Sequence, residues 1–175
     1  MAAATDTQSS PTRSPVELVR RALALVDQRD VEGMSALWAD DVVVEFLAVG
    51  VFRGKAAARA YFAEVFAATP DLRTEVQRIA GEGDTVFVQW RTTGTFTGAA
   101  FQGIEPTGRA IDLRGMDCFT VRDGKIAANL VAYDGATFAR QIGMLPPQGS
   151  GADRAVTSAF NATTRLRRRL KSSGS

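Results

Sequence analysis

The chain has 175 residues, about the length of one domain with a single core. Hydrophobic residues make up 45% of it and charged residues 23%, as in ordinary globular proteins, and no apolar run approaches the roughly 20 residues of a membrane span. There is one cysteine and no histidine, which excludes an internal disulfide and removes the commonest ligand of zinc and iron sites.

The absence of metal-binding, nucleotide-binding and secretion motifs excludes further classes of protein. No EF-hand or P-loop spacing is present, so we expect neither a metal nor a cofactor. The first residues lack a basic segment followed by an apolar stretch, so they do not resemble a secretion signal. These features predict a cytoplasmic protein without a membrane partner.

The formal net charge of +2 conceals an asymmetry along the chain. Residues 26–45 are acidic, whereas the final stretch TTRLRRRLKSSGS is strongly basic. A basic tail can hold nucleic acid or anionic lipid. No aromatic residues are interleaved with these cations for base stacking, so we expect a solvated helix end and no nucleic-acid partner.

The first half of the chain has the patterns of helices and one strand. Residues 1–14 are predicted to be disordered, and Ser14 is a suitable N-cap for a helix that begins at Pro15. Further elements are predicted in chain order: a short helix over 31–39, a strand over 42–49, and a helix over 54–70 that is closed by Thr69-Pro70.

The periodicity then changes to that of strands. Two strands are predicted within 72–98, around a turn at 81–84. Two more are predicted over 110–121 and 125–133, joined by a hairpin turn at Arg122-Asp123-Gly124. A short helix over 136–143 follows, with Asp134 as its N-cap and Gly143 at its end.

Helices followed by hairpin-linked strands predict an α+β fold. We expect a curved antiparallel sheet, wrapped by the N-terminal helices into a cone with an apolar interior. The expected domain spans 15–147, and 148–175 is expected to be a linker and a basic C-terminal helix. That helix, over 154–170, carries a broken apolar stripe and is expected to cover either the sheet edge or the pocket mouth. The stripe consists of Val156, Phe160, Leu166 and Leu170.

Five stretches resemble the SnoaL-like polyketide cyclases of the nuclear transport factor 2-like superfamily. They are PDLRTEV (70–76), GDTVFVQWRTTGTFTG (83–98), GIEPTGRAI (103–111), FTVRDGKI (119–126) and YDGATFARQIGMLP (133–146). The resemblance spans roughly residues 15–146 and implies a cone-shaped α+β barrel. It also implies a homodimer that pairs through the outer face of the sheet.

The resemblance points to one position where this chain departs from the family. In the cyclases, the last long strand usually reads Gly-Lys-Ile, a variable residue, and then Glu-His-Trp-Asp. Here Gly124-Lys125-Ile126-Ala127 is followed by Ala-Asn-Leu-Val, so the family's catalytic aspartate falls on Val131. Valine cannot transfer a proton, and an acid elsewhere must replace it if the chain is an enzyme.

Asp117 is the replacement that the neighbouring strand offers. Alternation along 111–121 places Asp117 on a face that is otherwise apolar, shared with Phe119. The resemblance to the family places Asp117 on the strand next to that of Val131, opposite Val131. Desolvation on such a face raises the pKa of a carboxyl toward the value that a general acid or base needs.

Asn129 and Tyr133 complete the predicted catalytic set. Asn129 replaces the family's histidine and can donate to a carbonyl, while Tyr133 can donate to a developing oxyanion. The predicted substrate-binding residues are Trp38, Phe46, Tyr61, Gln89, Arg91, Phe119 and Val131. Gln89 and Arg91 belong to the pocket only if their face of the strand 85–92 points into the cone, which the sequence does not decide.

Three functions fit these residues. The first is a cofactor-independent cyclase or isomerase, a lyase or isomerase of secondary metabolism, that performs acid–base chemistry on an apolar polycyclic carbonyl substrate. The second is a non-catalytic module that binds an apolar small molecule after loss of the family's acid machinery. The third is an epoxide hydrolase or epoxide-opening enzyme, which requires an acid pair beside an arginine.

Overall fold

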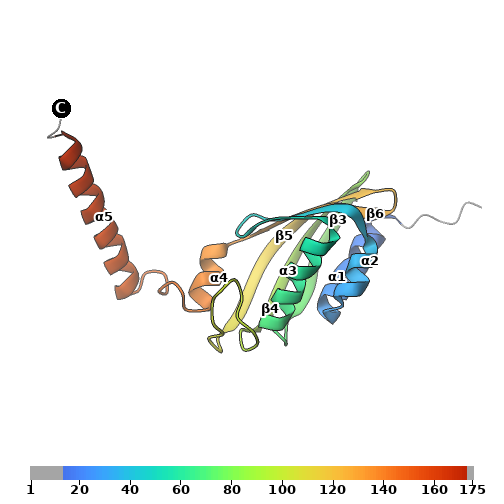
Figure 1. The fold of residues 1–175 in the computed structure, drawn as a ribbon, viewed down its shortest axis with the longest axis horizontal. Coiled ribbons are helices and arrows are strands. Elements are labelled where there is room, and N and C mark those ends of the chain that lie inside the picture. The colour runs from blue at the N-terminus through green and yellow to red at the C-terminus, as the bar shows by residue number, and fades with distance from the viewer. Residues whose placement is uncertain (1–13, 173–175) are drawn as a thin grey trace, which may run out of the picture.

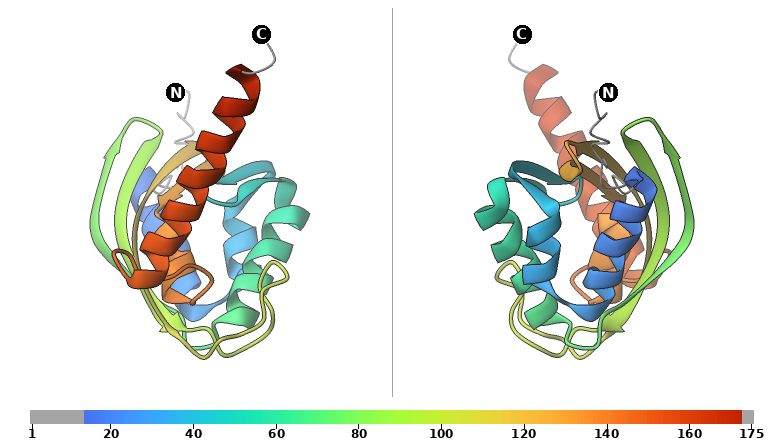
Figure 2. Two further views of the ribbon diagram at one scale, coloured as in Figure 1. Left: turned by 90° about the vertical axis from the view of Figure 1, so that its left-hand side faces the viewer. Right: turned by 90° about the vertical axis from the view of Figure 1, so that its right-hand side faces the viewer.

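A curved six-stranded sheet forms the body of the molecule, and three helices pack against its concave face (Figures 1 and 2). The computed structural model describes residues 14–172, so the predicted disorder of residues 1–13 lies outside the described part of the chain. The helices are α1 (Pro15–Gln28), α2 (Val31–Leu37), α3 (Gly54–Ala68), α4 (Gly135–Gln141) and α5 (Gly151–Ser172). The strands are β1 (Trp38–Phe46), β2 (Gly50–Arg53), β3 (Arg73–Glu82), β4 (Thr85–Thr95), β5 (Ala110–Arg122) and β6 (Lys125–Tyr133).

The strand order β2-β1-β6-β5-β4-β3 explains how distant segments build one wall. Strands β3 to β6 form an antiparallel meander, in which two-residue turns join β3 to β4 and β5 to β6, and the longer loop 96–109 joins β4 to β5. Strand β1 joins the sheet beside β6, as the one parallel pair among the named strands of residues 14–172. The predicted α+β cone is confirmed.

Local sequence signals set several of the boundaries. Ser14 and Glu17 form a reciprocal capping box at the start of α1, with Pro15 in its first turn. In the β5–β6 hairpin, Asp123 and Gly124 have φ angles of 53° and 69°, the left-handed conformation that a tight two-residue turn requires. The Asp134 carboxylate accepts hydrogen bonds from the first turn of α4, as predicted.

The region around β1 and β2 differs from the prediction. Helix α2 ends at Leu37, and Trp38 is the first residue of β1, so the expected helix over 31–39 is two residues too long. The strand over 42–49 instead spans Trp38–Phe46. The edge strand β2 was not predicted, because four residues are too few to show an alternating pattern.

Helix α5 projects away from the sheet and from helices α1 to α3 (Figure 1). Every residue from 154 to 170 is exposed except Thr164, which is half-buried. The helix covers neither the sheet edge nor the mouth of the cone, so both predicted placements are wrong. Among the described residues, no helix combines the length and the apolar character that a membrane crossing requires.

Candidate functional site

A cavity of about 170 Å³ lies between the concave face of the sheet and helices α1 to α3. Its walls are mainly aliphatic and aromatic. The aromatic lining residues are Trp38, Phe46, Tyr61, Phe62, Phe66, Trp90, Phe101, Phe119, Tyr133 and Phe138. Asp117 is the one acidic side chain among the lining residues, and no lysine or arginine lines the cavity in the described part of the chain. The space therefore suits an apolar ligand that meets a single ionisable carboxyl.

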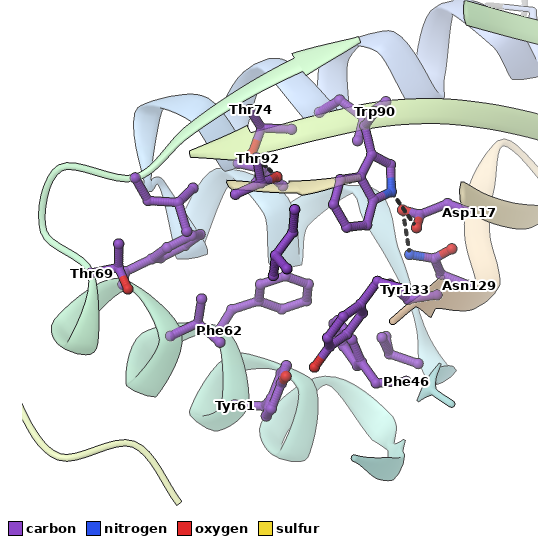
Figure 3. Close-up of a pocket in the computed structure, with 18 of the residues that line it drawn as sticks. Phe46, Tyr61, Phe62, Thr69, Thr74, Trp90, Thr92, Asp117, Asn129 and Tyr133 are labelled. Carbon is purple, nitrogen blue, oxygen red and sulfur yellow. Dashed lines mark hydrogen bonds between the residues drawn. The ribbon is translucent and has the colours of Figure 1, made fainter. Parts of the chain in front are cut away.

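Asp117 is buried on the inner face of β5 and holds two hydrogen bonds (Figure 3). The indole Nε1 of Trp90 on β4 donates to its Oδ1 at 2.8 Å. The amide Nδ2 of Asn129 on β6 donates to its Oδ2 at 3.3 Å. Three neighbouring strands thus fix the orientation of one carboxyl.

Burial sets the proton affinity of this carboxyl. Asp117 is only 6% exposed, and removal from water raises its pKa to about 6. The hydrogen bonds from Trp90 and Asn129 lower the pKa, because they favour the charged form, and so partly oppose the effect of burial. A carboxyl with a pKa close to neutrality can both accept and return a proton.

The strand register brings these groups together. Asp117 pairs with Val88 on one side and with Val131 on the other. Trp90 lies opposite Gly115, where a β-carbon would stand only 2.3 Å from Cζ2 of the indole. Glycine at 115 therefore leaves the room that the indole occupies when it reaches the carboxyl.

Asn129 is 7% exposed, and its Oδ1 is buried without a hydrogen-bond partner. The amide nitrogen donates to the ionised carboxyl of Asp117. Rotation of the amide by half a turn would offer the oxygen to a protonated carboxyl instead. One side chain can therefore serve both protonation states of Asp117.

Two tyrosines stand at the same end of the cavity. Figure 3 shows Tyr133 from β6 and Tyr61 from α3 with their hydroxyls directed toward one another. Burial raises the pKa of both phenols above the ordinary value, and for Tyr61 the proximity of Tyr133 adds to the rise. Both therefore remain protonated near neutral pH and can donate a hydrogen bond to an oxygen of a ligand.

A second polar group lies at the other end of the cavity. The hydroxyls of Thr74 on β3 and Thr92 on β4 are 3.0 Å apart, and both residues line the cavity (Figure 3). Only one of the two hydroxyl protons is used between them, so the other can meet a ligand oxygen. Thr92 pairs with Leu113, four residues from Asp117 along β5, which is about 13 Å along the strand.

Most of the predicted site residues line this cavity. They are Asp117, Asn129, Tyr133, Trp38, Phe46, Tyr61, Phe119 and Val131. Gln89 and Arg91 do not, and their predicted place in the pocket is wrong. Alternation along β4 turns Val86, Val88 and Trp90 inward, so Gln89 and Arg91 lie on the outer face, where Arg91 forms an ion pair with Asp112 at 2.6 Å.

Sequence reasoning missed the role of Trp90 and the threonine pair. The composition of β4 could have revealed Trp90, because the face that Trp90 shares with Val86 and Val88 is the more apolar face of that strand. Thr74 and Thr92 carried no such signal, because their contact depends on the pairing of β3 with β4. Within residues 14–172, no group of three or more aspartate, glutamate or cysteine side chains is arranged to hold a metal ion.

Comparisons with known proteins show which proteins this chain is similar to. Among solved structures, a SnoaL-like polyketide cyclase candidate from Jannaschia sp. CCS1 is 27% identical, with a TM-score of 0.65, over 77% of this chain and 98% of that one. IdmH, a candidate polyketide cyclase from Streptomyces antibioticus, is 25% identical, with a TM-score of 0.65, over 75% and 99% of the two chains.

AclR, a candidate hydroxylase from Streptomyces galilaeus, shares the fold at 22% identity, with a TM-score of 0.68, over 90% of this chain and 94% of its own. No curated protein matches the chain. The model of the SnoaL-like polyketide cyclases matches residues 16–142, which include all of the cavity-lining residues. The chain belongs to the SnoaL-like polyketide cyclase family.

Proposed function

We propose that this protein is a cofactor-independent cyclase or isomerase that performs acid–base chemistry on an apolar polycyclic carbonyl compound of the polyketide type. The observation that carries this proposal is one buried carboxyl, Asp117, with its pKa raised to about 6, on the wall of an otherwise apolar cavity. Such a group is positioned and poised for proton transfer on the wall of an apolar cavity.

The proposed reaction begins when the Asp117 carboxylate removes a proton from a carbon next to a carbonyl group. The electron pair of that C–H bond forms an enolate, whose negative charge lies on the carbonyl oxygen. In a cyclisation, the enolate carbon then bonds to the carbon of a second carbonyl, and the resulting alkoxide takes the proton back from Asp117. In an isomerisation, Asp117 returns the proton to a different carbon.

The tyrosines and Asn129 have supporting roles in this scheme. Tyr133 and Tyr61 donate hydrogen bonds to the oxygen on which negative charge develops, which stabilises the enolate. Asn129 holds Asp117 in one orientation and accommodates its change of protonation state.

Cavity composition supports the proposed substrate class. With no cationic side chain among its described lining residues, the cavity lacks a partner for a highly charged substrate. Its aromatic walls offer flat surfaces to a ring system. The threonine pair provides a polar contact at the end opposite Asp117.

The proposal is tested by proton exchange. Cyclic and polycyclic ketones are incubated with the protein in deuterium oxide, and incorporation at the carbon next to the carbonyl is followed by NMR. We expect the wild-type protein to catalyse exchange, and Asp117→Asn to lose it while keeping ligand affinity. Exchange at the wild-type rate in the variant would contradict the proposed role of Asp117.

A non-catalytic binding module is the second candidate, and one observation favours it. Val131 stands where the family's catalytic aspartate is expected, so the customary acid is lost. This candidate predicts ligand binding without exchange in either protein. Epoxide opening ranks lower, because the described lining of the cavity offers one acid and no arginine.

We also propose that two copies of this chain pair through the outer face of the sheet. Phe87 and Met116 are 57% and 62% exposed there, and Leu130 lies beside them. A charge at Met116, introduced as Met116→Glu, is expected to weaken the pairing, as measured by sedimentation velocity. A sedimentation coefficient of Met116→Glu that equals that of the wild type at every concentration would contradict the proposed pairing.

A further inference from the structure

Helix α5 carries a stripe of four exposed apolar residues with no partner in the structure described. Val156, Phe160, Leu166 and Leu170 are between 59% and 70% exposed, although such side chains are normally buried on a helix of this kind. An isolated helix is marginal in water, and most helices gain their stability from packing of an apolar face. This exposed stripe therefore points to a missing partner.

A seam with the spacing of a coiled coil runs along α5; it includes three of these four residues, and Phe160 lies beside it. Successive seam residues are separated by four, three, four, three and four positions, which is a heptad pattern over the whole helix. They are Ala152, Val156, Ala159, Thr163, Leu166 and Leu170. Thr163 fits such a seam, because its hydroxyl donates to the carbonyl oxygen of Ala159 at 3.0 Å and needs no further partner.

We propose that α5 pairs with α5 of a second copy of this chain, in antiparallel orientation. In this arrangement the seam is self-complementary around a twofold axis. Ala152 faces Leu170, Val156 faces Leu166, and Ala159 faces Thr163, so that small residues oppose larger ones in most layers. Phe160, which flanks the seam, meets the same residue of the other copy at the axis.

Charge favours the antiparallel over the parallel pair. The arginines at 165, 167, 168 and 169 gather at the C-terminal end of α5, and a parallel pair would place two such groups side by side. In the antiparallel pair Arg167 of one copy lies level with residues 153–155 of the other, so the two arginine groups are separated by roughly 20 Å along the helix axis. The same arrangement places Arg167 of one copy opposite Asp153 of the other.

The shape of the molecule favours the same orientation. Helix α5 leaves the body at its N-terminal end and extends outward (Figure 1). In an antiparallel pair the two bodies lie at opposite ends of the helix pair, whereas a parallel pair would crowd them at one end. This contact uses a different surface from the outer face of the sheet, so it adds to any pairing there.

Cysteine cross-linking tests the orientation directly. All variants carry Cys118→Ser, which removes the single native thiol. Oxidation of a mixture of the full-length Ala152→Cys and Leu170→Cys proteins is expected to give a disulfide-linked dimer, while neither variant alone gives one. Cross-linking of each variant with itself would show a parallel pair and overturn the proposal, as would no cross-linking at all.

Two variants that add a charge to α5, one inside the seam and one on the opposite face, measure the contribution of the seam to self-association. Val156→Asp is expected to weaken self-association at least tenfold by analytical ultracentrifugation, whereas Ser158→Asp, on the opposite face of α5, leaves it unchanged. Equal association of Val156→Asp and the wild type would overturn the proposal. Full-length protein that stays monomeric and binds vesicles of anionic lipid through α5 would also overturn it, because the seam would then contact a lipid surface.

Discussion

Asp117 on β5 and Val131 on β6 are direct partners in the sheet, and both side chains line the same cavity. Val131 holds the position at which the family resemblance places a catalytic aspartate. The acid of this chain thus stands one strand away from the expected position, on the same wall. Neighbouring strands offer equivalent access to the cavity, so an acid on either one can reach a ligand there.

This relationship predicts the outcome of exchanging the two residues. Asp117→Val is expected to lower turnover by about 10²- to 10⁴-fold, the usual contribution of a general acid or base. Adding Val131→Asp to that variant should recover at least tenfold of the loss, because it restores an acid to the same wall. Steady-state kinetics or deuterium exchange measures both steps. Full activity in Asp117→Val would refute the assignment.

Burial of Asp117 predicts a specific dependence of stability on pH. Because the pKa is raised from 3.8 to about 6 on folding, the folded state keeps this proton to higher pH than the unfolded state. The stabilisation is fully present below about pH 4 and is lost as the pH rises through about 6. The loss amounts to about 3 kcal/mol in the free energy of unfolding.

Asp117→Asn provides the comparison, because it cannot ionise. Urea unfolding at pH 4 and pH 7.5 should show that the variant loses about 3 kcal/mol less stability than the wild type over this interval. Identical pH dependence in the two proteins would mean that Asp117 titrates as an ordinary solvated acid.

Removal of the Trp90 indole is predicted to raise the pKa of Asp117 further. The Nε1 donor favours the ionised carboxyl, and Trp90→Phe keeps an aromatic ring without that donor. A hydrogen bond to a charged group is worth about 1.5–3 kcal/mol, so the pKa should rise by about one to two units. The limb of the pH–rate profile that reports the base should then move to higher pH. A shift to lower pH would contradict the account.

Gly115 is predicted to be indispensable for the same hydrogen bond. In Gly115→Ala the new methyl group would meet the Trp90 ring and the carbonyl oxygen of Ala132, which lies 2.7 Å from the added β-carbon. Displacement of the ring should cost about 1–3 kcal/mol in unfolding free energy and slow turnover. Gly151→Ala is the control, because nothing lies within 4 Å of its added carbon. Equal stability of the two variants would contradict this reading.

The sequence predicted the wall that carries Asp117 because β5 alternates strictly. Its inward positions are apolar apart from that one acid and Gly115, while its outward positions are polar or mixed. Strand β4 was ambiguous, since large side chains occupy both of its faces. The direction of β4 depends on its pairing with β5, which decides that Trp90 and not Gln89 or Arg91 enters the cavity.

Contacts between distant segments lay beyond sequence patterns. The Thr74–Thr92 pair and the meeting of Tyr61 with Tyr133 depend on how strands and helices pack in space. The amphipathic pattern of α5 was visible in the sequence, but it does not specify what covers the apolar seam. The periodicity of a helix identifies its apolar face, but the partner that packs against this face is determined by the three-dimensional structure.

The carboxyl pKa of Asp117 is the most direct test of the central claim that this residue is a desolvated acid poised for proton transfer. It can be followed by carbon-13 NMR of aspartate-labelled protein, with the resonance assigned by its loss in Asp117→Asn. The account predicts a value of about 6. A value at or below the ordinary figure of about 3.9 would show a solvated or charge-paired carboxyl and would contradict the proposed chemistry.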